Sequence, residues 1–368
     1  MNKSFLFFLK IVFFFNIFIG NTVLAKKTTY KKFSEVEVRS EFDQQIKRYR
    51  ITSYVISGEF GQVYKAMDLD SKEDVILKLV DFKKTYSPKS TLPFGILYPN
   101  DIGLFTKRVE KAKLRIKKNN EILNENSTVN LVRVIDYGAP KSYWGYHNSR
   151  MIIVLQNEGL SSSGVVSLIS ELPGSKEFVK RLEFITDFID FSIAAVNELS
   201  YLGLIHGDIK PVNVMFNLLS KQFKLIDFET AKLYRNDSAN LVSTLPYRPS
   251  EWNDYKKHHK TNTDLYSVAI TAFSLLMGKG FTEELKQEIH DIQSKEIDGE
   301  VLLREFLNDI IIDLDSKLIE GNGSRELLEQ VRVFVYNLTH PIAKQREVVW
   351  KTVVSEKGSF SSCKLIFN

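Results

Sequence analysis

The chain contains almost no cysteine and carries little net charge. Its 368 residues include one cysteine, Cys363, which excludes an intrachain disulfide, a disulfide scaffold and a cysteine-based zinc site. A formal net charge of +5 is small for this length and does not indicate a nucleic-acid partner. Hydrophobic residues make up 43% and charged residues 26%, which excludes a largely disordered chain and allows a sizeable core.

The N-terminal apolar run is a poor membrane span, because Lys10 and Asn16 interrupt it. A basic start, this run, and Val23 and Ala25 fit a secretory signal peptide over residues 1–25, which predicts an exported or secreted protein. The alternative is an uncleaved anchor. In that case the lysines after the run hold the rest of the chain in the cytoplasm, and this segment is its only membrane contact.

After a polar, basic stretch over residues 26–45, which we expect to be a linker, the pattern changes to β-type alternation. A helical, basic stretch over residues 105–126 separates three expected antiparallel strands from two more. The five segments are R-Y-R-I-T-S-Y-V-I, Q-V-Y-K-A-M, D-V-I-L-K-L-V-D-F, L-V-R-V-I-D-Y-G and R-M-I-I-V-L-Q. From Val165 onward the pattern is mainly helical.

One stretch of the helical part contains a predicted β-hairpin. A polar loop, His206 to Asn213, follows an apolar helical run, and two short apolar runs, Val212 to Phe216 and Phe223 to Ile226, come next. A hairpin places the start of its first strand beside the end of its second. We therefore expect the residues that flank its two open ends to lie close together.

The residues at this hairpin mouth have the chemistry for phosphoryl transfer. Asn213 and Asp227 are expected to converge there, and both carry oxygen atoms suited to Mg²⁺. Asp208 and Lys210 in the preceding loop add a carboxylate that can orient a hydroxyl and a mobile cation.

These residues carry a family resemblance. The segment H-G-D-I-K-P-V-N resembles the catalytic loop of protein kinases, and D-F-E resembles their Asp-Phe-Gly metal motif. The resemblance implies that Asp208 orients the substrate hydroxyl and takes its proton, and that Lys210 contacts the γ-phosphate of ATP. It also implies that Asn213 and Asp227 hold Mg²⁺.

The first two strands also match the family. The segment V-I-S-G-E-F-G-Q-V-Y-K-A resembles the kinase glycine-rich loop, in which Gly58 and Gly61 match the second and third glycines. Ile56 stands in place of the first glycine. The resemblance assigns Ile56, Gly58, Gly61 and Val63 to nucleotide binding.

Lys78 lies in the apolar strand V-I-L-K-L-V, and a buried lysine requires a partner. The resemblance makes it the lysine that contacts the α- and β-phosphates and pairs with a helical glutamate. Glu110, Glu121 and Glu125 are available in the helix, and Glu121 lies nearest to the family position.

The segment S-T-L-P-Y-R-P-S-E-W resembles the end of a kinase activation segment. The resemblance implies that Thr244 hydrogen-bonds Asp208 and Lys210, and that Glu251 pairs with Arg346. It further implies that Asp264, in a later apolar helix, caps the backbone of the catalytic loop.

Three positions depart from the family pattern. Gly207 replaces an arginine that normally binds a phosphate on the activation loop, which predicts activity without that phosphorylation. Glu229 replaces the glycine of Asp-Phe-Gly, and Ile56 replaces a loop glycine. None of the three removes a catalytic group.

The resemblance implies an α+β, two-lobed kinase fold with a five-stranded sheet. A small β-rich N-lobe is expected over residues 46–156, a mainly helical C-lobe over 157–355 and a tail over 356–368. The implied activity is ATP- and Mg²⁺-dependent phosphorylation of serine or threonine in protein substrates. A nucleotide-binding pseudokinase that acts as an interaction module, or a small-molecule phosphotransferase, are the alternatives.

Overall fold

The computed structural model describes residues 30–57, 61–82, 99–126, 128–142, 145–146, 150–173, 175–233, 244–249, 262–294, 299–316, 322–340 and 345–348. Four predicted features lie outside these residues: the signal peptide or anchor of residues 1–25, the glycine-loop residue Gly58, the predicted Arg346 partner Glu251, and the tail of residues 356–368. Among the described helices, none has both the length and the apolar character that a membrane span requires.

The chain divides into two compact units. One consists of Met1–Ser87 and Asp136–Leu155, and the other of Pro88–Ile135 and Gln156–Asn368. Helix α3 (Pro99–Glu125) therefore belongs to the second unit, whereas the expected N-lobe of residues 46–156 included it.

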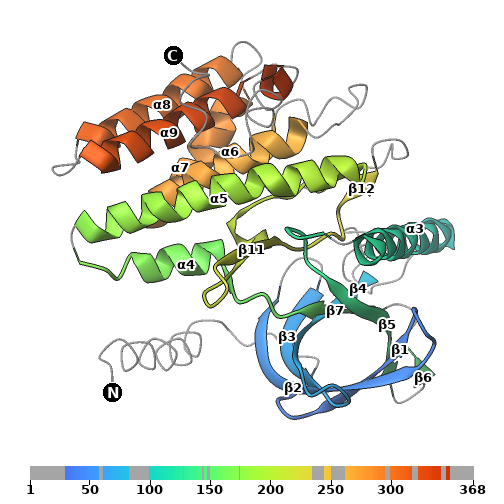
Figure 1. The fold of residues 1–368 in the computed structure, drawn as a ribbon. Helices are drawn as coiled ribbons and strands as arrows, with labels where there is room; N and C mark the ends of the chain where they lie inside the picture. The colour runs from blue at the N-terminus through green and yellow to red at the C-terminus, as the bar shows by residue number, and fades with distance from the viewer. Residues whose placement is uncertain are drawn as a thin grey trace, which may run out of the picture. The chain divides into compact units, whose positions relative to one another are not determined.

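The described part of the first unit is built around one sheet with the strand order β1-β2-β3-β4-β7-β5-β6. Strand β1 also pairs with β5, so the sheet closes into a ring (Figure 1). The five predicted strands are confirmed as β2, β3, β4, β5 and β7. The strands are β1 (Glu35–Ser40), β2 (Ile46–Ser57), β3 (Gly61–Asp68), β4 (Asp74–Asp81), β5 (Val134–Ser142), β6 (Gly145–Tyr146) and β7 (Arg150–Gln156).

The expectation of a linker over residues 26–45 is wrong for strand β1, which lies inside that range. Val36 and Val38 are buried in the sheet interior, and they alternate with more exposed charged residues along E-V-E-V-R-S. This period-two alternation places one face of the strand in the core. Burial of the two valines favours strand over linker.

A buried polar cluster ties β1 to β5. The Ser40 hydroxyl donates to Asp136 Oδ1 at 2.7 Å, and Lys47 Nζ lies 3.3 Å from Asp136 Oδ2. Burial raises the pKa of the Asp136 carboxyl above its ordinary value, although the Ser40 hydroxyl and the Lys47 ammonium lower it. These contacts help to close the sheet at this edge.

The described part of the second unit is mainly helical, with a small three-stranded sheet, β11-β10-β8, and a two-stranded sheet, β12-β9. Its helices, besides α3, are α4 (Ser162–Ile169), α5 (Ser175–Tyr201), α6 (Asn262–Met277), α7 (Glu283–Gln293), α8 (Gly299–Ser316), α9 (Asn322–Leu338) and the 3-10 turns η1 (Pro211–Asn213) and η3 (Gly278–Gly280). Its strands are β8 (Leu160–Ser161), β9 (Leu204–Ile205), β10 (Val214–Asn217), β11 (Gln222–Leu225) and β12 (Lys232–Leu233).

Aromatic packing fixes the predicted hairpin, which is confirmed as β10 and β11, against helix α5. Phe184 and Phe191 lie at helical spacing on α5, and their side chains reach the hairpin. The Phe184 ring centroid lies 5.3 Å from that of Phe216, and the Phe191 ring stacks on Phe223 at 5.2 Å. The hairpin mouth is therefore held at a defined place on α5.

Candidate active site

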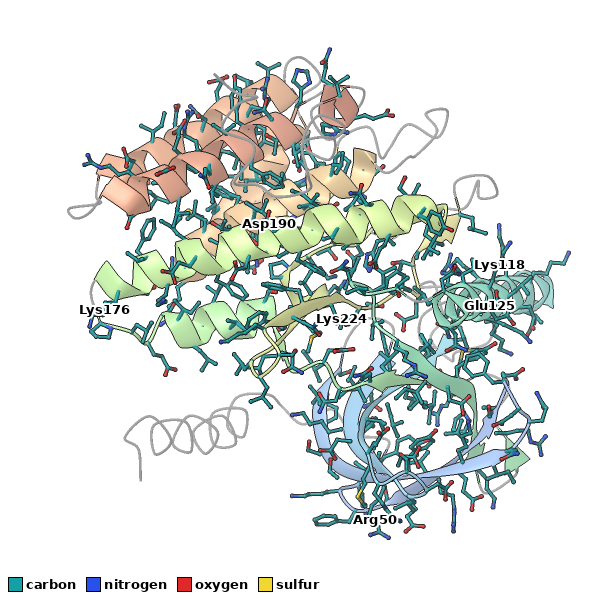
Figure 2. The ribbon with its side chains drawn as sticks, in the orientation of Figure 1. Arg50, Lys118, Glu125, Lys176, Asp190 and Lys224 are labelled. Carbon is teal, nitrogen blue, oxygen red and sulfur yellow. The ribbon has the colours of Figure 1, made fainter. Side chains whose placement is uncertain are left out.

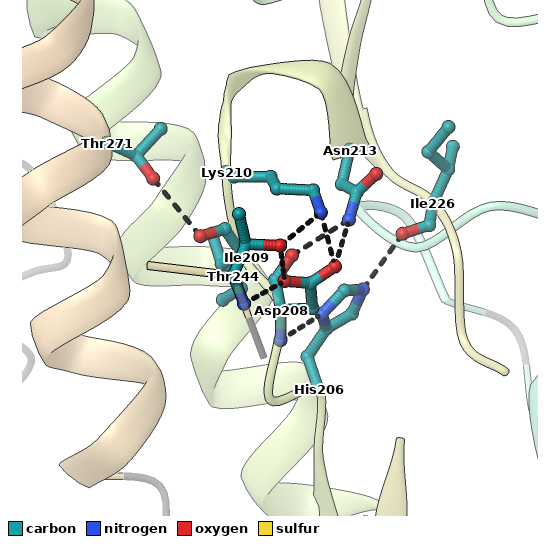
Figure 3. Close-up of polar contacts among 8 residues, drawn as sticks. All are labelled: His206, Asp208, Ile209, Lys210, Asn213, Ile226, Thr244 and Thr271. Atoms are coloured by element: carbon teal, nitrogen blue, oxygen red, sulfur yellow. Dashed lines mark hydrogen bonds and ion pairs between the residues drawn. The ribbon is translucent and has the colours of Figure 1, made fainter. Parts of the chain in front are cut away.

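Asp208 is the centre of a compact polar cluster in the second unit (Figure 3). Its Oδ2 lies 2.7 Å from Lys210 Nζ, and its Oδ1 accepts hydrogen bonds from the Thr244 hydroxyl at 2.8 Å and the Thr244 N–H at 3.1 Å. Lys210 Nζ also donates to the Thr244 hydroxyl at 2.6 Å. Asp208 is only 5% exposed, so its carboxylate is held in one orientation. The predicted contacts of Thr244 are confirmed.

Asn213 is oriented by the same aspartate. Its amide Nδ2 donates to the Asp208 carbonyl at 2.8 Å and to Asp208 Oδ2 at 3.2 Å. Because both bonds use the amide nitrogen, Oδ1 faces away from Asp208 (Figure 3). An amide oxygen in this position suits a hard cation such as Mg²⁺.

His206 connects the catalytic loop to the residue before Asp227. Its Nδ1 accepts from the Asp208 N–H at 3.2 Å, and its Nε2 lies 2.8 Å from the Ile226 carbonyl. A backbone N–H can only donate and a carbonyl can only accept, so the ring hydrogen lies on Nε2. His206 thus fixes the spacing between the loop and the end of β11.

Asp264 of helix α6 holds the backbone of the loop by accepting hydrogen bonds from it. Its two carboxylate oxygens accept from the N–H groups of His206 and Gly207 at 2.9 and 2.8 Å. Burial raises the pKa of Asp264 above its ordinary value, while these N–H groups and the nearby His206 lower it. The predicted capping contact is confirmed.

Gly207 has a structural reason to be glycine. Its φ angle is +78°, in the left-handed region that side chains with a Cβ rarely adopt. Glycine therefore lets the loop turn between His206 and Asp208 without backbone strain.

Asp227 lies beside Asn213, because the Ile226 N–H donates to the Asn213 carbonyl at 2.9 Å. The φ angle of Asp227 is +74°, an unusual value for an aspartate. Glu229, two positions on, does not enter the left-handed region, and its side chain is buried. The absence of glycine at position 229 therefore imposes no left-handed strain.

Within the first unit, three of the predicted nucleotide-binding residues form one row across neighbouring strands. Ile56 of β2 lies opposite Val63 of β3, which lies opposite Lys78 of β4. Directly opposite residues share a face of the sheet. Gly61 opens β3, and a Cβ there would lie 1.8 Å from the Leu79 carbonyl oxygen, so only glycine fits.

The sequence analysis missed one polar residue of helix α3. Asn119 donates to the Phe228 and Ala231 carbonyls, and Glu121, the predicted partner of Lys78, is half-buried on the same helix. Asn119 is a polar residue on the apolar face of this helix, and that pattern is the signal that identifies it. Glu251 lies outside the described residues, whereas Arg346 is buried and donates to the His340 carbonyl.

The protein side chains could supply only part of the coordination shell of a divalent cation, and water and substrate phosphates would supply the rest. Among the described residues, no cluster of three or more His, Cys, Asp and Glu side chains is placed to hold a metal. Mg²⁺ normally keeps few protein ligands and fills its shell with water and substrate phosphates. Asn213 and Asp227 are therefore a sufficient protein contribution.

Comparisons with known proteins agree with this site. A family model for the protein kinase domain matches residues 104–346, a range that begins after Gly61 and Lys78. Mitogen-activated protein kinase 13 of Pan troglodytes is 23% identical over 277 residues, which cover 72% of this chain and 64% of that protein. Calcium/calmodulin-dependent protein kinase kinase of Caenorhabditis elegans is 23% identical over 358 residues, which cover 91% of this chain and 61% of that protein.

A bacterial relative gives a similar match. Serine/threonine-protein kinase A of Synechocystis sp. is 27% identical over 244 residues, which cover 63% of this chain and 41% of that protein. The chain thus spans less than two thirds of the length of each of these relatives. The family model, however, matches more than half of the chain and includes the whole Asp208 cluster. The chain belongs to the protein kinase family.

Proposed function

We propose that this chain transfers the γ-phosphoryl group of ATP, with Mg²⁺, to serine or threonine hydroxyls of protein substrates. The observation that carries the proposal is the Asp208 cluster, in which Lys210, Thr244 and Asn213 all bond one buried carboxylate. Such positioned charge is the main requirement of phosphoryl transfer, which needs little covalent chemistry from the protein.

Four residues of the second unit each have a defined task in this proposal. Asp208 orients the substrate hydroxyl and accepts its proton, and Lys210 balances negative charge near the transferred group. Asn213 and Asp227 hold Mg²⁺ through their side-chain oxygens. Bound ATP and Mg²⁺ supply the phosphoryl group and the cation that neutralises its leaving oxygens.

The row of Ile56, Val63 and Lys78 in the first unit is proposed to bind the nucleotide, together with Gly61 at the start of β3 and with Gly58. Lys78 is 9% exposed, and a lysine that is so little hydrated favours an anionic partner. Its register opposite Val63 keeps it on the same sheet face as Ile56. The pairing of Lys78 with Glu121 stays a prediction.

Serine and threonine are favoured as acceptors by the loop sequence. Lys210 follows Asp208 by two positions and precedes Pro211, a pattern that resembles serine/threonine kinases. The Synechocystis relative is named as a serine/threonine-protein kinase, which supports the same assignment. A protein substrate is favoured over a small molecule by the segment around Thr244, which resembles the peptide-binding ledge of protein kinases.

The deciding experiment compares the purified full-length chain with its Asp208→Asn variant, using Mg²⁺, γ-labelled ATP and a casein and histone mixture. We expect the variant to lose about 10²–10⁴-fold in rate, because the general base is removed. Phosphoamino-acid analysis of the wild-type product should give phosphoserine and phosphothreonine.

An exposed aspartate provides the matched control. Asp309→Asn on α8 makes the same chemical change at the surface and should leave the rate unchanged. Label on tyrosine alone would contradict the serine/threonine assignment. If the wild type binds MgATP but transfers no phosphate, the proposed enzymatic activity is contradicted. That result would favour the pseudokinase alternative, which was suggested by the departures from the family pattern at Glu229 and Ile56.

A further inference from the structure

Asp227 is held on its N-terminal side by the catalytic loop. The residue before it, Ile226, is bonded at both backbone groups. Its carbonyl accepts from His206 Nε2 at 2.8 Å, and its N–H donates to the Asn213 carbonyl at 2.9 Å. These bonds set where the chain enters Asp227.

Helix α3 holds the C-terminal side. Residues 228–231 form a turn in which the Ala231 N–H donates to the Phe228 carbonyl at 3.2 Å. Asn119 Nδ2 bridges this turn by donating to the Phe228 carbonyl at 2.9 Å and to the Ala231 carbonyl at 3.0 Å. Arg115, one helical turn earlier, donates from Nε to the Glu229 carbonyl at 3.1 Å. Three carbonyls of the segment are therefore bonded to one helix.

The position of Asn119 in the helix indicates that these hydrogen bonds explain why a polar side chain is buried there. Asn119 is 2% exposed and lies on the face of α3 that also buries Ala112, Ile116 and Leu123. An amide in such a place is costly unless its polar atoms are bonded. Both of its donor hydrogens are used on the turn, so the burial is compensated there.

Asp227 itself needs support from both sides. Its φ angle of +74° is sparsely populated, and such a conformation persists only where the surroundings enforce it. The turn that Asn119 bridges begins at the next residue, so loss of that bridge frees Asp227 to leave the left-handed region.

We propose that Asn119, assisted by Arg115, is a positioning residue that holds Asp227 in place for Mg²⁺. The inference rests on the proposed function of Asp227 as a metal ligand. It assigns to an asparagine amide a link between α3 and the segment after Asp227, a contact that is separate from the predicted pairing of Lys78 with Glu121. Both residues must be donors, because the two groups bonded by Asn119 and the one bonded by Arg115 are all carbonyl acceptors.

Two variants of the full-length chain test the proposal. Asn119→Leu keeps the side-chain size and removes the donors, whereas Asn119→Asp keeps the shape and turns an acceptor toward two carbonyls. Asn124→Leu makes the first change at an exposed position of the same helix and is the matched control.

The first readout does not depend on activity. Hydrogen exchange of the Ala231 amide, which closes the turn, should be about tenfold faster in Asn119→Leu and faster still in Asn119→Asp, with no change in Asn124→Leu. The second readout is kinetic: the Mg²⁺ concentration that gives half of the maximal rate, and the KM for MgATP. Both should rise about tenfold while kcat changes less, because Asp227 is in place in a smaller fraction of molecules.

The outcomes separate this proposal from the proposed function. Unchanged exchange at Ala231 in both Asn119 variants, or an equal effect of Asn124→Leu, would overturn the positioning role. If the wild type transfers no phosphate, the proposed function fails. The exchange result and the Mg²⁺ dependence of a thermal shift with ADP then still decide whether Asn119 holds Asp227.

Discussion

The catalytic loop and the segment that carries Asp227 are held by groups of opposite hydrogen-bonding character. Asp264 holds the loop by accepting hydrogen bonds from two backbone N–H groups. Asn119 and Arg115 hold the other segment by donating to backbone carbonyls. Each anchor therefore matches the kind of backbone group that its segment presents, N–H donors in the loop and carbonyl acceptors in the segment after Asp227.

The two anchors also lie on helices of different kinds. Every residue of α6 from 263 to 276 is buried, so Asp264 is fixed in the core of its unit. Helix α3 buries one face only, and Lys118 and Glu125 lie on its exposed side (Figure 2). The loop that carries Asp208 is thus anchored to the core, and the segment after Asp227 is anchored to a surface helix. A change at α3 can alter Asp227 without disturbing Asp208.

The largest expected effect comes from removing the core anchor. Asp264→Ala should lower the free energy of unfolding by about 2–6 kcal/mol, because two buried N–H groups lose their acceptor at about 1–3 kcal/mol each. Asp264→Asn keeps one oxygen acceptor and should cost about half of that. Denaturant unfolding of the three proteins measures the difference.

The matched control is Asp309→Ala on the exposed side of α8, which should lie within about 0.5 kcal/mol of the wild type. A loss for Asp264→Ala as small as that of the control would show that the loop does not depend on α6, and would remove the contrast between the two anchors.

A smaller effect is expected inside the loop. Gly207→Ala should lower the free energy of unfolding by about 1–2 kcal/mol, because alanine strains at a φ angle of +78°. Gly280→Ala is the control, since its φ is not in that region and its added Cβ would meet only the tip of Met277, at 3.4 Å. Equal losses in thermal unfolding would mean that the loop relaxes around residue 207 and is less rigid than its anchor suggests.

Much of the catalytic loop was predictable because its evidence is local. The hairpin follows from two apolar runs and a polar gap, and it brings Asn213 beside the residue before Asp227. The contacts of Thr244 and Asp264 followed from the family resemblance. Asn119 was missed because the family pattern directed attention to glutamates, although a buried asparagine between Ile116 and Leu123 breaks the apolar face of α3.

The first unit shows a different reason for a missed element. Strand β1 alternates over only six residues, and its second partner is β5, far along the chain. A short alternation cannot reveal a non-local partner, so the polar composition around it favoured a linker. Ile56, Val63 and Lys78 were each named from the family resemblance, but the row that they form was not predicted, because its register depends on irregularities in the pairing of β2 with β3 that no local pattern encodes.

The smallest expected effect is that of removing phosphate from the protein, which should leave the transfer rate unchanged. The family arginine that binds an activation-loop phosphate is Gly207 here, and the Gly207 N–H is already bonded to Asp264. The described anchors of the loop and of the Asp227 segment consist of unmodified side chains, Asp264 on one side and Asn119 and Arg115 on the other. Neither anchor requires a phosphate to form.

Phosphatase treatment should therefore leave the transfer rate within about twofold of that of the untreated protein. Loss of phosphate from casein in the same tube serves as proof that the phosphatase is active. A large fall in rate would show that another cation binds a phosphate in this chain, and that at least one anchor depends on it.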